Sequence, residues 1–249
     1  MSDLVSIIIP YYRKKPFFEK TIDSINSQTY KNFEIILIYD DNNRSDLLFV
    51  KKVLKKIKNK KIIVNKKNLG VGISRNRGIN KSKGKFLSFI DADDVWNRDK
   101  LKKQIKFMKK NSLDFSYSDY SIINEKGILI KKIKSPKTIK FKNLLFSCDI
   151  ALSSVTIRSK LLRSEKFSNI KTKEDYLLWL KLSQKNIKMM GIRENLIFWR
   201  KTNNSLSSSI VQKFKDAFLV YNKYLKLNFL VSIVLIFFLS INSIIKRYL

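Results

Sequence analysis

Histidine is absent from the chain, and several other residue types that often carry chemistry or shape are scarce. Without an imidazole there is no Ser-His triad and no histidine base or metal ligand, so acid–base and metal chemistry must depend on carboxylates. The single cysteine, Cys148, excludes an intrachain disulfide and fits a reducing compartment. Only 6 glycines and 3 prolines are present, which argues against a loop-rich or fibrous protein.

Acidic residues are also few, since 20 Asp and Glu stand against 52 Lys and Arg, giving a formal net charge of +32. Such a surplus fits a polyanionic partner: an anionic membrane, a nucleic acid or a phosphorylated substrate. The lysines are spread along the chain, so a compositional bias of the kind found in proteins from AT-rich genomes is the alternative explanation. With 249 residues, 44% of them hydrophobic, the chain can build one large α/β domain, with or without an appendage.

The N-terminal part of the chain alternates between short apolar, β-branched runs and amphipathic stretches. The runs predict buried strands, the first of them stopped by Pro10 in a segment that does not resemble a secretory signal. Apolar residues at helical spacing, such as Phe18, Ile22 and Ile25, predict the intervening helices. The expected strands are residues 5–9, 33–39, 61–64 and 86–90, and the expected helices include 46–58, 71–82 and the segment around 101–108. This alternation predicts an α/β fold with a mostly parallel sheet, helices on both faces, and ligands at the carboxyl ends of the strands.

The second half of the chain is less regular. Residues 117–123 and 128–133 predict a hairpin, and further elements are expected at 153–157 (strand), 174–184 (helix) and 196–200 (strand). Residues 229–245 are strongly apolar, and about 17 residues lie near the lower limit for crossing a bilayer. A transmembrane or interfacial helix is favoured there, and a helix packed on the domain is the alternative. The lysine-rich, aromatic residues 212–226 suit an anionic membrane surface, so we expect a globular domain at 1–205 and membrane-associated helices at 206–249.

Three carboxylates crowd the end of the strand expected at residues 86–90. Asp91, Asp93 and Asp94 repel one another, and without a cation at least one of them is pushed toward protonation. Mg²⁺ or Mn²⁺ relieves this repulsion, because such ions take oxygen ligands together with substrate phosphates. The alternative is a solvated loop in which one aspartate caps the next helix.

Three other polar clusters stand at places where a ligand could bind. Asp40 and Asp41 follow the second strand, where they could accept hydrogen bonds from a base or a ribose, although a plain turn explains them as well. Arg75 lies in a helix with a glycine-rich entrance that suits phosphate, unless the glycines serve helix packing alone. Glu174 and Asp175 begin a helix, where acids complement the helix dipole, but a carboxylate there could also be a general base.

The order of these motifs resembles glycosyltransferase family 2 over roughly residues 4–200. The resemblance rests on residues 5–12, the Ser-Gln-Thr-Tyr segment at 27–30, residues 68–78, the Phe-Ile-Asp-Ala-Asp-Asp run at 89–94 and the Glu-Asp-Tyr helix at 174–176. It implies a GT-A (Rossmann-like) fold, a nucleotide-diphosphate sugar donor, a divalent metal, and inversion at the anomeric carbon. The implied roles are Pro10 and Tyr12 in the nucleotide pocket, Asp40 or Asp41 at the base, Arg75 at the diphosphate, Asp91 at the ribose, Asp93 on the metal, Glu174 at the substrate and Asp175 as the base for the acceptor hydroxyl.

The sequence departs from the family pattern in two places. The second motif, which usually reads Asp-Asp-Gly-Ser, is Asp40-Asp41-Asn42-Asn43, and Arg13 stands where the family often has Asn-Arg.

From the resemblance as a whole we expect an inverting glycosyltransferase that acts on a lipid-linked or polysaccharide acceptor at the cytoplasmic face of the plasma membrane, with no nucleic acid as partner. The alternatives are a nucleotidyltransferase of related fold, which would need a glycine-rich loop with a lysine near residue 10, and a basic nucleic-acid-binding module.

Overall fold

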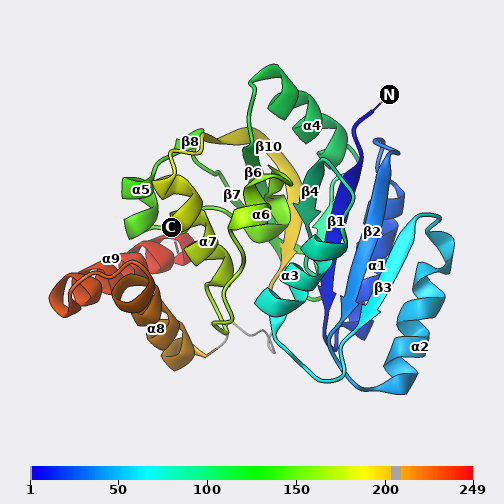
Figure 1. Cartoon of the computed structure of the whole chain (residues 1–249), viewed down its shortest axis with the longest axis horizontal. Helices are drawn as coiled ribbons and strands as arrows, with labels where there is room; N and C mark the ends of the chain where they lie inside the picture. The colour runs from blue at the N-terminus through cyan, green and yellow to red at the C-terminus, as the bar shows by residue number, and fades with distance from the viewer. Residues whose placement is uncertain (1, 203–208, 249) are drawn as a thin grey trace.

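The computed structural model describes residues 2–202 and 209–248. Within them a ten-stranded mixed sheet has the order β3-β2-β1-β4-β9-β6-β10-β5, with β7 beside β6 and β8 beside β10 (Figure 1). The strands are β1 (Val5–Tyr11), β2 (Phe33–Tyr39), β3 (Lys60–Val64), β4 (Phe86–Phe89), β5 (Val95–Trp96), β6 (Phe115–Ile123), β7 (Leu129–Ile133), β8 (Thr138–Ile139), β9 (Thr156–Arg158) and β10 (Met189–Arg200). The α-helices are α1 (Lys15–Asn26), α2 (Arg44–Val53), α3 (Val71–Lys81), α4 (Lys100–Lys110), α5 (Phe141–Phe146), α6 (Leu161–Ser164), α7 (Glu174–Gln184), α8 (Ile210–Phe218) and α9 (Phe229–Tyr248).

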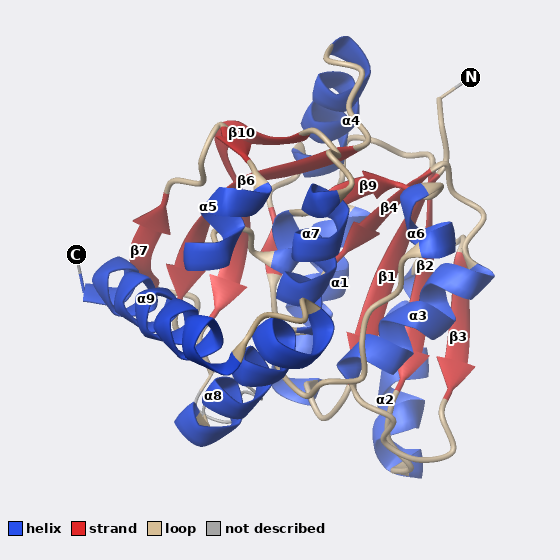
Figure 2. Ribbon diagram, turned by 60° about the vertical axis from the view of Figure 1, so that its left-hand side comes forward, coloured by secondary structure: helices blue, strands red, loops and turns tan. Residues whose placement is uncertain are grey.

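Strands β3, β2, β1 and β4 run parallel, and the strands inside the edge strand β3, namely β2, β1 and β4, are buried on both faces. Along β1, Ile8 packs into one core with α3 and α7, while Ile7 and Ile9 pack into the other with α1, α2 and α4 (Figure 2). Burial on both faces explains why these strands are continuous apolar runs. The predicted α/β fold is confirmed, although the second half of the sheet mixes parallel and antiparallel pairs.

Pro10 does not stop the first strand, as the sequence predicted, because β1 continues to Tyr11 and pairs Pro10 with Ile38. The amide of Ile90 donates to the carbonyl of Ile8, so the backbone N–H and C=O groups of Ile8 point toward β4. Pro10, two residues further, faces the same side, where β4 has already ended at Phe89. Its missing N–H therefore costs no ladder hydrogen bond.

Other boundaries differ from the predictions by a few residues. The helix expected at 46–58 is α2, which begins after Asn43, whose side chain accepts from the amide of Asp46, and continues only as a 3₁₀ turn over Leu54–Lys56. The short strand expected at 196–200 is the end of the 12-residue strand β10. The first half of β10 was not predicted, and the pairing of β10 with β6 is irregular in register after Ile192. The hairpin of β6 and β7 and the helix at 174–184 are confirmed.

The C-terminal helices pack on the domain through one side of α9. Its Leu235, Ile236 and Leu239 join the core that contains α7, and the ring of Phe238 meets Phe146 of α5 edge-on at 5.7 Å. Among the residues that the structure describes, none of the helices has both the length and the apolar character needed to cross a membrane. The prediction that residues 229–245 form a transmembrane helix is therefore wrong for the described residues. The expected domain boundary at 205/206 lies outside the described residues.

Candidate active site

The predicted polar clusters meet at one edge of the parallel sheet. Tyr12 follows β1, Asp40 and Asp41 follow β2, and the acidic turn follows β4, so all three come from the carboxyl ends of neighbouring strands. The first turn of α7, which carries Glu174 and Asp175, is joined to this edge by Arg75 of α3. The structure thus brings the sequence-predicted site residues into one region.

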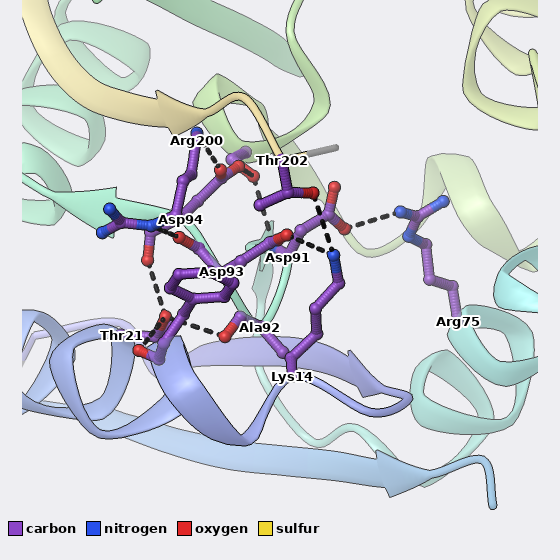
Figure 3. Close-up of polar contacts among 11 residues, drawn as sticks. Lys14, Thr21, Arg75, Asp91, Ala92, Asp93, Asp94, Arg200 and Thr202 are labelled. Carbon is purple, nitrogen blue, oxygen red and sulfur yellow. Dashed lines mark hydrogen bonds and ion pairs between the residues drawn. The ribbon is translucent and has the colours of Figure 1, made fainter. Parts of the chain in front are cut away.

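The acidic run Asp91–Asp94 forms a tight turn held from below by α1. The amide of Asp94 donates to the carbonyl of Asp91 at 3.0 Å. The hydroxyl of Thr21 lies 3.0 Å from the carbonyl of Ala92 and 2.8 Å from that of Asp94 (Figure 3). Because the backbone carbonyls are tied to α1, the three carboxylates of the run are presented in fixed directions.

Asp93 is paired with a lysine that no sequence motif marked as a site residue. The ammonium of Lys14 lies 2.6 Å from a carboxylate oxygen of Asp93 and 3.5 Å from the hydroxyl of Thr202 (Figure 3). Burial raises the pKa of Asp93, Lys14 opposes that rise, and the charge of Asp91 adds to it. A cation therefore already stands beside the carboxylate predicted to hold the metal.

Asp94 faces the interior of the protein. One of its oxygens accepts the hydroxyl of Ser153, and the other accepts the backbone amide of Arg200 at 2.8 Å. Burial, followed by the charges of Asp93 and Asp91, raises the pKa of Asp94 well above its ordinary value. The guanidinium of Arg200 donates to the carbonyl of Asp93 at 2.8 Å, so β10 clamps the turn from the side opposite Thr21 (Figure 3).

Arg75 links the acidic turn to α7. Its buried guanidinium donates to Asp91 at 2.8 Å and to Glu174, and it lies over the ring of Phe167. Burial raises the pKa of Glu174 to about 7, with Arg75 opposing the rise. Burial also raises the pKa of Asp175, which is again opposed by Arg75. A carboxyl group with a raised pKa at this position is suited to accept a proton.

The structure separates the roles of Asp40 and Asp41. Asp40 accepts hydrogen bonds on both oxygens, from the side chain of Asn65 at 2.6 Å and from the amides of Leu69 and Gly70 at 2.8 and 3.0 Å. The positive φ of Gly70, +87°, allows the chain to turn into α3 while presenting that amide. Asp40 therefore fastens the loop that leads to Arg75.

Asp41 is instead held by a surface side chain. The guanidinium of Arg13, whose side chain is 69% exposed, lies 3.0 Å from Asp41 and 4.9 Å from the ring centroid of Tyr12. Tyr12 is 37% exposed, whereas Pro10, within β1, is buried. An arginine that is mostly in solvent can move away, so Asp41 and Tyr12 are the members of this cluster that a ligand can reach.

The sequence missed the cations and hydroxyls that hold the predicted carboxylates. No sequence pattern marked Lys14 or Arg200, because they are two of 52 basic residues. The hydroxyls of Ser153 and Thr202 belonged to no motif either. Among the described residues, no three His, Cys, Asp or Glu side chains form a group that could by itself hold a metal ion.

Comparison with known proteins identifies the class. The family model described as glycosyl transferase family 2 matches residues 6–170, which include the acidic turn and Arg75. The chain therefore belongs to glycosyltransferase family 2, and it is a glycosyltransferase.

Two relatives and one solved structure define the neighbourhood more closely. The chain is 36% identical over 250 residues to the Escherichia coli UDP-Glc:alpha-D-GlcNAc-diphosphoundecaprenol beta-1,3-glucosyltransferase WfaP, covering 98% of this chain and 96% of the relative. It is 30% identical over 231 residues to the putative teichuronic acid biosynthesis glycosyltransferase TuaG of Bacillus subtilis, covering 91% and 90%. The fold is similar to that of the mannosyltransferase PcManGT from Pyrobaculum calidifontis in complex with GDP-Man and Mn²⁺, with a TM-score of 0.70, 13% identity, and coverage of 92% of this chain and 66% of the other.

Proposed function

We propose that the chain is an inverting glycosyltransferase that moves a sugar from a nucleotide-diphosphate sugar to a hydroxyl group of a lipid-linked or polysaccharide acceptor. One observation carries this proposal: a cation-paired carboxylate, Asp93, lies just beyond the carboxyl end of β4, and Arg75 connects the same acidic turn to Glu174, the neighbour of the half-buried Asp175. An arrangement of this kind can hold a diphosphate on one side and accept a proton on the other.

The nucleoside part of the donor is assigned to the cluster at the ends of β1 and β2. Tyr12 offers an exposed ring on which a base can stack, and Asp41 offers a carboxylate for the base or the ribose once Arg13 moves aside. Asp40 acts indirectly, because its oxygens already accept the loop amides before α3. Asp91, whose side chain is 34% exposed, is the acid nearest to Arg75 that a ribose hydroxyl could reach.

The carboxylates fit a Mg²⁺ or Mn²⁺ ion whose remaining ligands are donor phosphates and water. Burial and mutual repulsion raise the pKa values of Asp93 and Asp94, and the ammonium of Lys14 occupies the position of a counter-ion at Asp93. When bound, a divalent ion would neutralise charge on the leaving diphosphate. Asp93 would be the protein ligand, while Asp94 shapes the turn through Ser153 and Arg200.

Asp175 is assigned as the general base. Its carboxylate would take the proton of the acceptor hydroxyl while that oxygen bonds to the anomeric carbon and the bond from this carbon to the diphosphate oxygen breaks. Attack from the face opposite the leaving group inverts the anomeric centre. Asp175 already accepts the amide of Tyr176 on one oxygen at 2.7 Å, which fixes the direction of the carboxylate. Arg75 holds Glu174 and Asp91 on either side, so it positions the base relative to the donor.

The names of two relatives support the proposed class of acceptor. The Escherichia coli relative is named for a diphosphoundecaprenol-linked acceptor, and the Bacillus subtilis relative for teichuronic acid biosynthesis. A lipid-linked sugar of cell-surface glycan synthesis, met at the cytoplasmic face of the plasma membrane, is therefore the acceptor that we assign to this chain.

Calorimetric titration of the full chain with UDP, GDP and their sugar conjugates, with and without Mn²⁺, tests the proposal. We expect a nucleoside diphosphate to bind more tightly with Mn²⁺ present, and Asp93→Ala to abolish that difference. Asp23→Ala, which removes a carboxylate that is 58% exposed on α1, is the matched control and should behave like the parent. Failure of the folded parent chain to bind Mn²⁺ or any nucleoside diphosphate would overturn the proposal.

A further inference from the structure

Helix α9 is apolar around its whole circumference, but only one side of it is covered. Ser232, Leu235, Ile236 and Leu239 are buried against the domain at helical spacing. The opposite side exposes large side chains, including Leu230 at 75%, Phe237 at 60% and Val234 at 52%. A helix with apolar residues all round is normally buried on every side. The outer side of α9 therefore lacks a covering layer among the described residues.

Helix α8 also exposes large apolar side chains. Its Ile210 is 68% exposed, Val211 65% and Phe214 47%. The ribbon in Figure 2 shows α8 and α9 together at one corner of the molecule, beside α7. We call the exposed apolar side chains of α8 and of residues 229–245 in α9 the C-terminal apolar face. Exposed apolar side chains gathered on two helices that contact each other mark an interaction site.

Positive charge accompanies the C-terminal apolar face. Residues 210–245 contain four lysines and a single acidic residue, Asp216. Lys215, Lys223 and Lys226 are exposed, whereas Asp216 is buried and accepts the amide and the hydroxyl of Thr172, both at 2.8 Å. The described surface of these helices is therefore apolar and basic, with no exposed acid.

We infer that the C-terminal apolar face lies flat in the interfacial layer of a bilayer that contains anionic lipid. Apolar side chains combined with lysines are the composition of helices that rest in the headgroup region, where the chains enter the acyl boundary and the lysines meet anionic headgroups. Since no helix of the described residues can cross a membrane, this attachment is to one leaflet. A second copy of the chain fits poorly, because pairing two such faces would bring the lysines of two chains with a charge of +32 together.

The bilayer surface is held at a fixed place relative to the base. Asp216 of α8 binds Thr172, two residues before α7 begins at Glu174. The hydroxyls of Tyr221 and Tyr176 lie 2.8 Å apart, which ties the turn after α8 to α7 itself. Attachment through α8 and α9 therefore orients Asp175 with respect to the membrane. This role in meeting a lipid-linked acceptor rests on the proposed function, whereas the attachment rests on the helices alone.

Flotation of the full chain with phosphatidylcholine vesicles, with and without phosphatidylglycerol, tests the inference. We expect tight binding only to the vesicles that contain phosphatidylglycerol. Leu230→Ser with Phe237→Ser should weaken it at least about tenfold, because two exposed apolar anchors are lost. Lys215→Gln, Lys223→Gln and Lys226→Gln together should weaken it about a hundredfold and remove most of its salt dependence. The control is Leu48→Ser, which alters a 66% exposed leucine of α2 at the opposite end of the molecule and should change nothing (Figure 1).

Two results would overturn the inference. One is that vesicles with and without phosphatidylglycerol recover the parent chain equally. The other is a dimer, detected by light scattering, that dissociates when Leu230→Ser and Phe237→Ser are introduced together. The nucleotide titration described above is run on the same preparations. Loss of vesicle binding with intact nucleotide binding rejects the membrane surface alone, and the reverse result rejects the proposed donor chemistry alone.

Discussion

Two cation–carboxylate pairs flank the site, and they differ in burial. Lys14 reaches Asp93 with a side chain that is 24% exposed, and its other polar contact, with Thr202, is long at 3.5 Å. Arg75 is only 3% exposed and holds two carboxylates at once, Glu174 and Asp91. One pair is formed by a flexible cation near solvent, and the other by a rigid, fork-shaped cation inside the protein.

This difference separates an exchangeable cation from a permanent one. A lysine is a point charge on a flexible stem, so another cation can replace it at small cost when one arrives with phosphates. A buried arginine with two carboxylates cannot leave without exposing unpaired charge to a low-dielectric interior. Exchange is therefore expected on the donor side, at Asp93, and fixed geometry on the acceptor side, at Asp175.

The largest expected effect is on the fixed side. Asp175→Asn should lower turnover by about 10²–10⁴-fold, since an amide cannot take the proton of the attacking hydroxyl. Donor binding should be unchanged, because Asp175 is not among the residues assigned to the donor. Release of nucleoside diphosphate from the nucleotide sugar measures turnover, and calorimetry measures binding. Full turnover in Asp175→Asn would show that the base has been assigned to the wrong residue.

Removal of the permanent cation should cost stability. Arg75→Met leaves Glu174 and Asp91 without their partner, and breaking a buried pair from one side typically costs about 3–5 kcal/mol. Urea denaturation gives the free energy of unfolding. Arg13→Met is the control, because Arg13 is 69% exposed in its pair with Asp41 and its loss should cost less than about 1 kcal/mol. Equal losses in the two variants would remove the distinction between the pairs.

Removal of the exchangeable cation should instead change metal affinity. Lys14→Met frees Asp93 of its counter-ion, so Mn²⁺ should bind about tenfold more tightly in the absence of nucleotide. Stability should change by less than about 1 kcal/mol, since the lysine is partly exposed. Calorimetric titration with Mn²⁺ alone measures the affinity. The neighbouring Lys15→Met should leave it unchanged, and unchanged affinity in Lys14→Met as well would mean that the lysine does not compete with the ion.

The contrast between the pairs also explains what the sequence could predict. The acidic turn and the helix at 174–184 could be predicted because each depends on neighbouring residues. The apolar run before the turn and the helical spacing of the apolar residues placed them at the ends of a strand and a helix. The partners are not local: Arg75 is separated from Glu174 by 99 positions, and Arg200 from Asp94 by 106. Likewise, the composition of residues 229–245 indicated an apolar helix but not which side would pack, since that depends on α5 and α7.

A third cation, Lys100, differs from both Lys14 and Arg75. It is buried but forms no ion pair among the described residues. Its ammonium nitrogen lies 3.1 Å from the hydroxyl of Thr156, 3.3 Å from that of Ser88 and 4.0 Å from the ring centroid of Trp96. Burial lowers the pKa of Lys100 well below its ordinary 10.5. The unfolded chain therefore binds a proton that the folded chain refuses, and stability falls as the pH drops from 10.5 toward the folded pKa.

Lys100→Met should remove this penalty without leaving an orphan. The hydroxyls of Ser88 and Thr156 lie 2.6 Å apart and remain bonded to each other after the lysine is lost. Relative to the parent, the variant should gain stability as the pH is lowered from 9 to 6, by up to about 1.4 kcal/mol per unit, as urea denaturation at each pH would measure. Lys103→Met, which alters an exposed lysine paired with Glu194, should show no such trend. A difference between Lys100→Met and the parent that stays constant with pH would mean that Lys100 remains protonated in the folded protein.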